Sequence, residues 1–140
     1  MKPENRFRLS VHKFLPPPKE LHHEKMSNSY SSGTADDWYS GSGGDLWIEY
    51  KFLARVPQRA IVWLVNPNVK KPIMSALQQK WLSGRYAEGR NVGVIIGCPV
   101  GGVILRDLRW DYPITPQEFA KWLMPRDQIA TWLMKETLRK

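Results

Sequence analysis

The segment that most constrains the fold of this chain is residues 45–53, Asp-Leu-Trp-Ile-Glu-Tyr-Lys-Phe-Leu. Side chains alternate between the two faces of a β-strand, so a strand here places Glu49 and Lys51 on the same face. The opposite face is wholly apolar, and it can enter a hydrophobic core while the charged pair borders a cleft. The two faces are Trp47, Glu49, Lys51 and Leu53, and Leu46, Ile48, Tyr50 and Phe52.

Two carboxylates lie just upstream, at Asp36 and Asp37. We predict a second strand over residues 35–40, joined to the first by the glycine-rich turn at 41–44. Carboxylates on neighbouring strands can hold a divalent cation such as magnesium, which prefers oxygen ligands. A lysine beside them can stabilise a phosphate or a metal-bound hydroxide.

The three acids near this turn are not equivalent. Asp36 is the preferred ligand, whereas Asp37 is expected to point to the opposite face and into solvent. Asp45 shares the face of Glu49 and is therefore a rival ligand, but a carboxylate directly after Gly43 and Gly44 can instead close the turn. Glu49 and Lys51 could also form no more than a surface ion pair, which contributes little to stability.

The charge of the chain indicates an anionic partner. It has 21 Lys and Arg against 13 Asp and Glu, a net charge of +8, which favours nucleic acid. Residues 36–50 hold four acids and no Lys or Arg, whereas residues 51–90 hold eight basic residues and one acid. This arrangement suits a metal-dependent enzyme that acts on a polyanion. Candidate DNA-binding residues, for which solubility is the alternative explanation, are Lys25, Arg55, Arg59, Lys80 and Arg85.

A chain of 140 residues is long enough for one domain with its own core. We divide this single domain, residues 1–140, into a basic N-terminal arm or short strand at 1–19, a core at 20–105 and C-terminal helices at 115–140. The arm ends in three consecutive prolines, residues 16–18, which predict a stiff extended stretch.

The elements after the hairpin predict an α/β fold. Ser75 with Gln78, and Thr115 with Glu118, each match a helix capping box, and Gly89 suits the end of the first helix. The order of elements indicates a mixed sheet with flanking helices. We expect a strand at 60–65, a helix of about 13 residues from Ser75, strands at 91–97 and 103–106, a helix from Thr115 to Met124 and a final amphipathic helix.

Several residue types carry weaker signals. Cys98 is the only cysteine, which excludes an intramolecular disulfide and a thiolate zinc site. His12, His22 and His23 invite a metal-binding interpretation, but no further Cys or His cluster is present to complete a zinc site. The seven Trp could stack on bases, but the spacing of Trp81, Trp122 and Trp132 favours packing. No apolar run reaches 18 residues, so we expect a cytoplasmic protein with no membrane contact.

The chain resembles the PD-(D/E)XK nuclease superfamily, and within it the VRR-NUC group and small phage-encoded endonucleases. Gly33-Thr34-Ala35-Asp36 followed by Glu49-Tyr50-Lys51 is similar to the split signature of that superfamily. The helix Ser75-Ala-Leu-Gln78-Gln-Lys-Trp81-Leu and the strand after Gly89 match the pattern of the group. The resemblance covers roughly residues 20–105.

The resemblance implies a restriction-endonuclease-like core, a metal site and a catalytic lysine. Asp36 and Glu49 would bind Mg²⁺, for which Mn²⁺ could substitute, Lys51 would be catalytic, and Gln78 would lie near the site. Ala35 stands where the superfamily usually has proline. The superfamily also often supplies a glutamate from an N-terminal helix, and the candidates for this fourth acidic position are Glu20, Glu24 or none.

The function that follows is a magnesium-dependent endodeoxyribonuclease, selective for branched DNA such as a Holliday junction and acting as a homodimer. If phage-encoded, it would act in the host cytoplasm. Two alternatives stay open: a restriction-like or genome-degrading nuclease, and a non-catalytic DNA-binding or host-inhibiting phage protein on the same fold. Loss of cleavage on Asp36→Ala would separate the enzymes from the binding protein.

Overall fold

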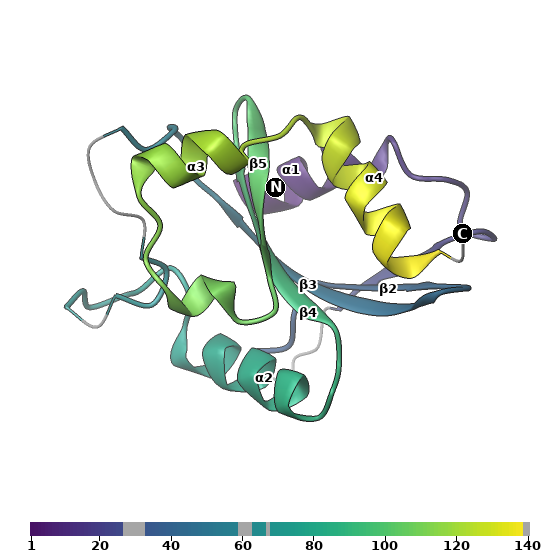
Figure 1. Cartoon of the computed structure of the whole chain (residues 1–140), viewed down its shortest axis with the longest axis horizontal. Coiled ribbons are helices and arrows are strands. Elements are labelled where there is room, and N and C mark those ends of the chain that lie inside the picture. The colour runs from purple at the N-terminus through teal and green to yellow at the C-terminus, as the bar shows by residue number, and fades with distance from the viewer. Residues whose placement is uncertain (27–32, 59–62, 67, 139–140) are drawn as a thin grey trace.

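Five strands form one mixed sheet in the order β1-β2-β3-β4-β5 (Figure 1). The computed structural model describes residues 1–26, 33–58, 63–66 and 68–138. This is the single α/β domain that the sequence predicts. The strands are β1 His22–Lys25, β2 Asp37–Gly41, β3 Gly44–Phe52, β4 Val92–Cys98 and β5 Gly101–Arg106.

The pairing of the strands places the charged pair at the centre of the sheet. β2 and β3 form the predicted antiparallel hairpin, with Asp37 opposite Ile48. β3 then runs parallel to β4, with Glu49 opposite Val94, and this is the one parallel pair among the described strands. Parallel neighbours need a crossover connection, and here the crossover carries helix α2.

Helices cover both faces of the sheet (Figure 1). One face packs α1 and α4 around a core that includes Ile48 and Tyr50 of β3. The other face packs α2 and α3 around the inward residues of β4 and β5. The helices are α1 Pro3–His12, α2 Ala76–Ala87, α3 Pro116–Trp122 and α4 Arg126–Thr137, with a 3₁₀ turn at Arg109–Asp111. No described helix is long and apolar enough to cross a membrane.

The predicted N-terminal arm is wrong, because residues 3–12 form helix α1, which is part of the domain core. Pro3 stands in the first turn, where its missing N–H is tolerated, and Phe7 and Val11 lie one helical turn apart and are both buried. A side chain at Gly97 of β4 would lie 2.4 Å from the ring of Phe7, so this glycine lets α1 approach the sheet. The prolines come only after the helix, where Pro17 accepts turn hydrogen bonds instead of continuing a stiff extended stretch.

Other predicted elements differ in smaller ways. The expected strand at 60–65 falls partly on residues outside those described, and the described residues 63–66 form no strand. Strand β1 was not predicted, because its sequence His-His-Glu-Lys lacks an apolar face. Helix α3 ends at Trp122 instead of Met124, and Met124 forms an isolated bridge with Gly102 of β5.

Candidate active site

Gln78 connects the two charged residues of β3 to the first turn of helix α2. Its amide nitrogen donates to Glu49 Oε2 over 2.9 Å, and its Oε1 accepts from Lys51 Nζ over 3.0 Å. The same Oε1 accepts from the backbone of Ser75, which closes the predicted capping box. One amide therefore closes the predicted capping box and also contacts both charged residues of β3.

Glu49 is buried on the helix α2 face of the sheet, with 2% of its surface exposed. Its Oε2 lies 3.3 Å from Lys51 Nζ, whereas its Oε1 is buried with no hydrogen-bond partner among the described residues. Burial raises the pKa of Glu49 to about 8, and the neighbouring charge of Asp36 adds to that rise. Lys51 acts in the opposite direction but does not outweigh the burial.

Asp36 lies directly beside Glu49, as the sequence predicts. Its Oδ2 accepts the backbone N–H of Tyr50 over 2.8 Å, which fixes the carboxylate against β3. The charge of Asp36 next to the buried carboxyl of Glu49 raises the pKa of Glu49 further. Glu49 therefore either keeps a proton or shares a cation with Asp36.

Gly33 holds the segment before Asp36 against helix α2. Its φ is +88°, in the left-handed region, and a side chain here would place its Cβ 2.4 Å from the backbone oxygen of Leu77. Only glycine satisfies both conditions. The glycine of the sequence signature is therefore explained by a close backbone approach between the Asp36 loop and the first turn of α2.

A hollow of about 450 Å³ opens beside Asp36 and is lined by the first turns of helix α1. Glu4 and Asn5 of α1 line it together with Lys25 and Asp36. Glu4 is thus the acid that an N-terminal helix brings to this region. Glu20 and Glu24, the acids considered from the sequence, do not line the hollow, because Glu20 lies in a turn and Glu24 on the exposed edge strand.

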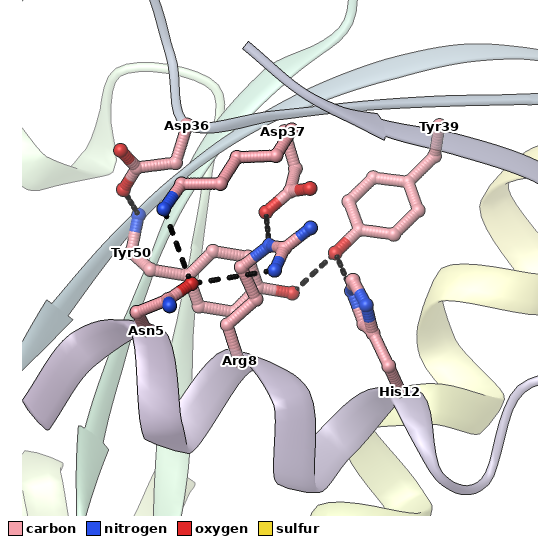
Figure 2. A network of polar contacts seen from close by, with 8 residues as sticks. Asn5, Arg8, His12, Asp36, Asp37, Tyr39 and Tyr50 are labelled. Carbon is pink, nitrogen blue, oxygen red and sulfur yellow. Dashed lines mark hydrogen bonds and ion pairs between the residues drawn. The ribbon is translucent and has the colours of Figure 1, made fainter. Parts of the chain in front are cut away.

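A second polar network lies under the sheet, between α1 and strands β2 and β3 (Figure 2). Arg8 donates to Asp37, while Tyr39 Oη lies 2.6 Å from Tyr50 Oη and 2.7 Å from His12 Nε2. The prediction that Asp37 faces solvent is wrong, because α1 covers it completely and its exposed fraction is 0%. Burial raises the pKa of Asp37 to about 6, against the opposing effect of Arg8.

The same network contains His12, one of the three histidines considered as metal ligands from the sequence. Burial lowers the pKa of His12 to about 3, so its ring is neutral and hydrogen-bonded to Tyr39. The ring of His23 packs 4.4 Å away, centroid to centroid. Among the described residues, no three His, Cys, Asp or Glu side chains gather into a metal-binding group.

The site therefore fits a divalent cation with two carboxylate ligands better than a closed all-protein cage. The unpartnered Oε1 of Glu49 and the adjacent carboxyl of Asp36 are what such a cation would satisfy. Magnesium usually keeps several waters and uses one or two carboxylates. Asp45, the rival ligand, instead accepts from Trp38 Nε1 and Ser40 Oγ at the hairpin turn.

The five predicted DNA-binding residues occupy different parts of the molecule. Lys25 lines the hollow beside Asp36 and donates to Asn5 over 3.4 Å. Arg55 is exposed in the loop after β3, and Arg59 lies outside the described residues. Lys80 and Arg85 are exposed on α2, where Arg85 pairs with Glu88 over 3.2 Å.

Glu4, Asn5 and Arg8, which all belong to helix α1, were not among the residues predicted from the sequence. A usable signal was present, because Pro3 and Glu4 suit a first helical turn and Phe7 and Val11 have helical spacing. The three prolines at 16–18, which are typical of an extended segment, follow this helix and are not part of it.

The comparisons with known proteins bear on the fold. Neither a protein-family model nor a curated protein sequence matches the chain. Among solved structures, it matches the 1.6 Å resolution structure of Hjc, a Holliday junction resolvase from the archaeal hyperthermophile Archaeoglobus fulgidus. The TM-score is 0.54 at 14% sequence identity, over 93% of this chain and 97% of that chain. The two proteins share their fold. At this identity the likeness extends to architecture, and the restriction-endonuclease-like core expected from the sequence is confirmed.

Proposed function

We propose that this protein is a metal-dependent endonuclease that hydrolyses phosphodiester bonds in DNA. The observation that carries the proposal is the buried pair of Asp36 and Glu49, held next to Lys51 by the amide of Gln78. A buried, unpartnered carboxylate oxygen destabilises a fold unless a ligand satisfies it. Strongly raised carboxyl pKa values in a polar cluster are typical of functional sites.

Each residue has a distinct role in the proposed reaction. Asp36 and Glu49 would bind Mg²⁺, or Mn²⁺ in its place, and Glu4 lines the hollow beside Asp36. The bound cation would polarise the scissile phosphate and activate water. Lys51 stabilises the negative charge that develops on the phosphate, and Gln78 orients both Lys51 and Glu49.

Branched DNA is the proposed substrate class. Support comes from the fold shared with a Holliday junction resolvase and from the net charge of +8. Lys25, at the hollow beside Asp36, and the exposed Arg55, Lys80 and Arg85 contact phosphates in this proposal, as does Arg59 from the sequence alone. A domain of this size has little surface with which to read a long base sequence, which favours recognition of DNA structure.

We also propose a homodimer, because a symmetric pair of sites can cut two strands of one junction. The supporting feature is an apolar hollow of about 390 Å³ between β5, α3 and α4. Arg106 and Arg109 border it, each over a tryptophan ring. Its apolar lining is Ile104, Leu105, Trp122, Met124 and Trp132.

Cleavage of labelled four-way junction, duplex and single-stranded DNA tests the proposal, with magnesium or EDTA. We expect magnesium-dependent cleavage of the junction that is lost in Asp36→Asn and Lys51→Ala, whereas Asp45→Asn keeps it. Loss in Asp45→Asn with retention in Asp36→Asn would move the metal site to the turn.

The same assay separates the alternatives. Equal cleavage of linear duplex would indicate a restriction-like or genome-degrading nuclease. DNA binding that is equal in wild type and variants, with no cleavage under any divalent cation, would indicate a non-catalytic DNA-binding protein.

A further inference from the structure

Three tryptophans form a continuous row across the helix α2 face of the sheet. We define the tryptophan row as Trp38 of β2, Trp47 of β3 and Trp81 of α2. The rings of Trp38 and Trp47 stack with centroids 5.9 Å apart, and Trp47 meets Trp81 edge to face at 5.4 Å. His22 of β1 extends the row, with its ring 5.3 Å from Trp38.

Packing accounts for only part of this row. Trp47 and Trp81 rest against the buried core under α2, so they anchor that helix to the sheet. Trp38 belongs to neither described core, and His22 beyond it is exposed. On the face that carries the row, helix α2 contacts β4 and helix α3 contacts β5, whereas α1 and α4 pack on the opposite face. No described helix therefore covers β1 and β2 on the face of the row. Trp38 stacks on Trp47 and donates to Asp45, but no described helix packs on its indole ring.

The row lies on the same face as Glu49. Trp47 precedes Glu49 by two residues on β3, and residues two apart on a strand share a face. Asp36 directly precedes β2 and lies beside Glu49. Two residues of strand span about 7 Å. A DNA strand held at Asp36 and Glu49 thus reaches the row with a nucleotide close to the one being cut.

Positive charge lies along the far side of the row. Arg85 lies over the ring of Trp81, 5.5 Å from its centroid, and is half of an exposed ion pair with Glu88. Arg85 and Arg90 line a hollow of about 520 Å³ together with Trp47, Asn91 and Asp45. The carboxylate of Asp45 is already engaged by Trp38 and Ser40, so the two arginines dominate the charge that this hollow offers a ligand.

We propose that the tryptophan row, with Arg85 and Arg90, binds unpaired nucleotides of the DNA substrate beside the catalytic carboxylates. This inference rests on the proposed nuclease function and specifies how its site recognises DNA. Aromatic rings combined with cations are how proteins bind single strands without reading their sequence. Bases in an intact duplex are stacked on one another, so this surface selects DNA whose bases are exposed, as at a branch point or flap.

Binding measurements in EDTA test the proposal without any cleavage. Fluorescence anisotropy of a labelled single-stranded oligonucleotide and of its duplex is measured with the full chain, Trp38→Ala, Trp38→Phe and the control Phe14→Ala, an exposed aromatic residue outside the row. We expect Trp38→Ala to weaken single-strand binding about tenfold and duplex binding much less, because stacking on a base is lost. Trp38→Phe retains most of the affinity, and Phe14→Ala binds like wild type.

A charge variant keeps the test open if Trp38→Ala fails to fold. Arg90 is exposed, and Arg90→Gln should weaken single-strand binding and lower its dependence on salt by about one ion. The proposal is overturned if both variants bind single strands like wild type, or if Trp38→Ala weakens single-strand and duplex binding equally. A change in oligomeric state with unchanged binding would instead make the row an interface between copies.

The outcome is separable from that of the proposed function. If single-strand binding depends on the tryptophan row but the protein never cleaves DNA, the proposed nuclease function is overturned and the proposal for the row stands. If cleavage is normal but single-strand binding does not change in the Trp38 and Arg90 variants, the nuclease function stands and the proposal for the row is overturned.

Discussion

Replacing Glu49 with glutamine should stabilise the metal-free protein while abolishing cleavage. The side chain of Glu49 is buried and keeps one oxygen unpartnered beside Asp36. In Glu49→Gln, the amide oxygen can still accept from Gln78 and Lys51, and the new N–H can donate to Asp36. The variant removes a buried charge and fills the empty hydrogen-bond position, but it loses an anionic metal ligand.

The size of the effect follows from the pKa of Glu49, which rises from 4.5 in its ordinary environment to about 8 in the fold. A folded-state pKa above the unfolded value means that the folded protein holds a proton that the unfolded chain releases. The free energy of unfolding therefore falls as pH rises between these values. At about 1.4 kcal/mol for each tenfold change in proton affinity, Glu49 costs about 1 kcal/mol at pH 5 and about 4 kcal/mol at pH 8.

Thermal and urea denaturation of wild type and Glu49→Gln in EDTA, across pH 5 to 8, measures this difference. We expect the variant to melt roughly 10 °C higher at pH 8 and to gain much less at pH 5. Glu88→Gln, in an exposed ion pair, is the control and should change little. Magnesium should raise the melting temperature of wild type at pH 8 but not that of Glu49→Gln.

The reasoning fails if Glu49→Gln is less stable than wild type at pH 8, or if the difference between the two proteins is the same at pH 5 and pH 8. Either result would mean that Glu49 is ionised in the metal-free fold and that its burial is compensated. Other acids with raised pKa values, such as Asp37, contribute to both proteins and cancel in the difference.

Three further changes test other parts of the structure. Arg8→Met leaves Asp37 buried without its cation and should lower the free energy of unfolding by about 3–5 kcal/mol in urea titrations. The double variant Arg8→Met/Asp37→Leu should recover most of that loss. A double variant as unstable as the single variant would contradict this prediction. Gly33→Ala combines positive φ with a backbone collision and should lose about 2–4 kcal/mol in thermal melts, whereas Gly89→Ala has similar φ and open space and should lose only about 1 kcal/mol. Trp132→Lys should convert the proposed dimer to monomer in light scattering after size-exclusion chromatography, whereas Trp132→Phe should not; a monomeric wild type would end the dimer proposal.

The sequence was sufficient for the parts of the fold that local patterns encode. The alternation in residues 45–53 predicts correctly that Glu49 and Lys51 share one face of β3 and that Ile48 and Tyr50 enter the core on the other. The Ser75 capping box locates the start of α2 because its hydrogen bonds lie within one turn. These signals depend on neighbours close in the chain, so they can be read without the fold.

The parts that could not be predicted depend on contacts between distant residues. Asp37 is buried because Arg8, 29 positions earlier, pairs with it from helix α1. That helix was not predicted, because the prolines after it indicated an extended segment. Strand β1 exists because β2 offers it a partner, not because its own sequence favours a strand. The double role of Gln78 needed Glu49 to be placed, 29 positions away, against the first turn of α2.

The Gln78 amide also has an evolutionary consequence. Its oxygen faces two donors and its nitrogen faces a carboxylate, so the direction of its hydrogen bonds is matched to its neighbours. Glutamate at position 78 would repel Glu49 but could still accept a hydrogen bond from Lys51. Methionine at position 78 would lose the hydrogen bonds to both residues. Among homologous chains, positions 49, 51 and 78 should consequently change together, while position 33 stays glycine wherever α2 begins against the Asp36 loop. The residues of the site are inherited as one unit, although they are spread over 46 positions of the sequence from 33 to 78.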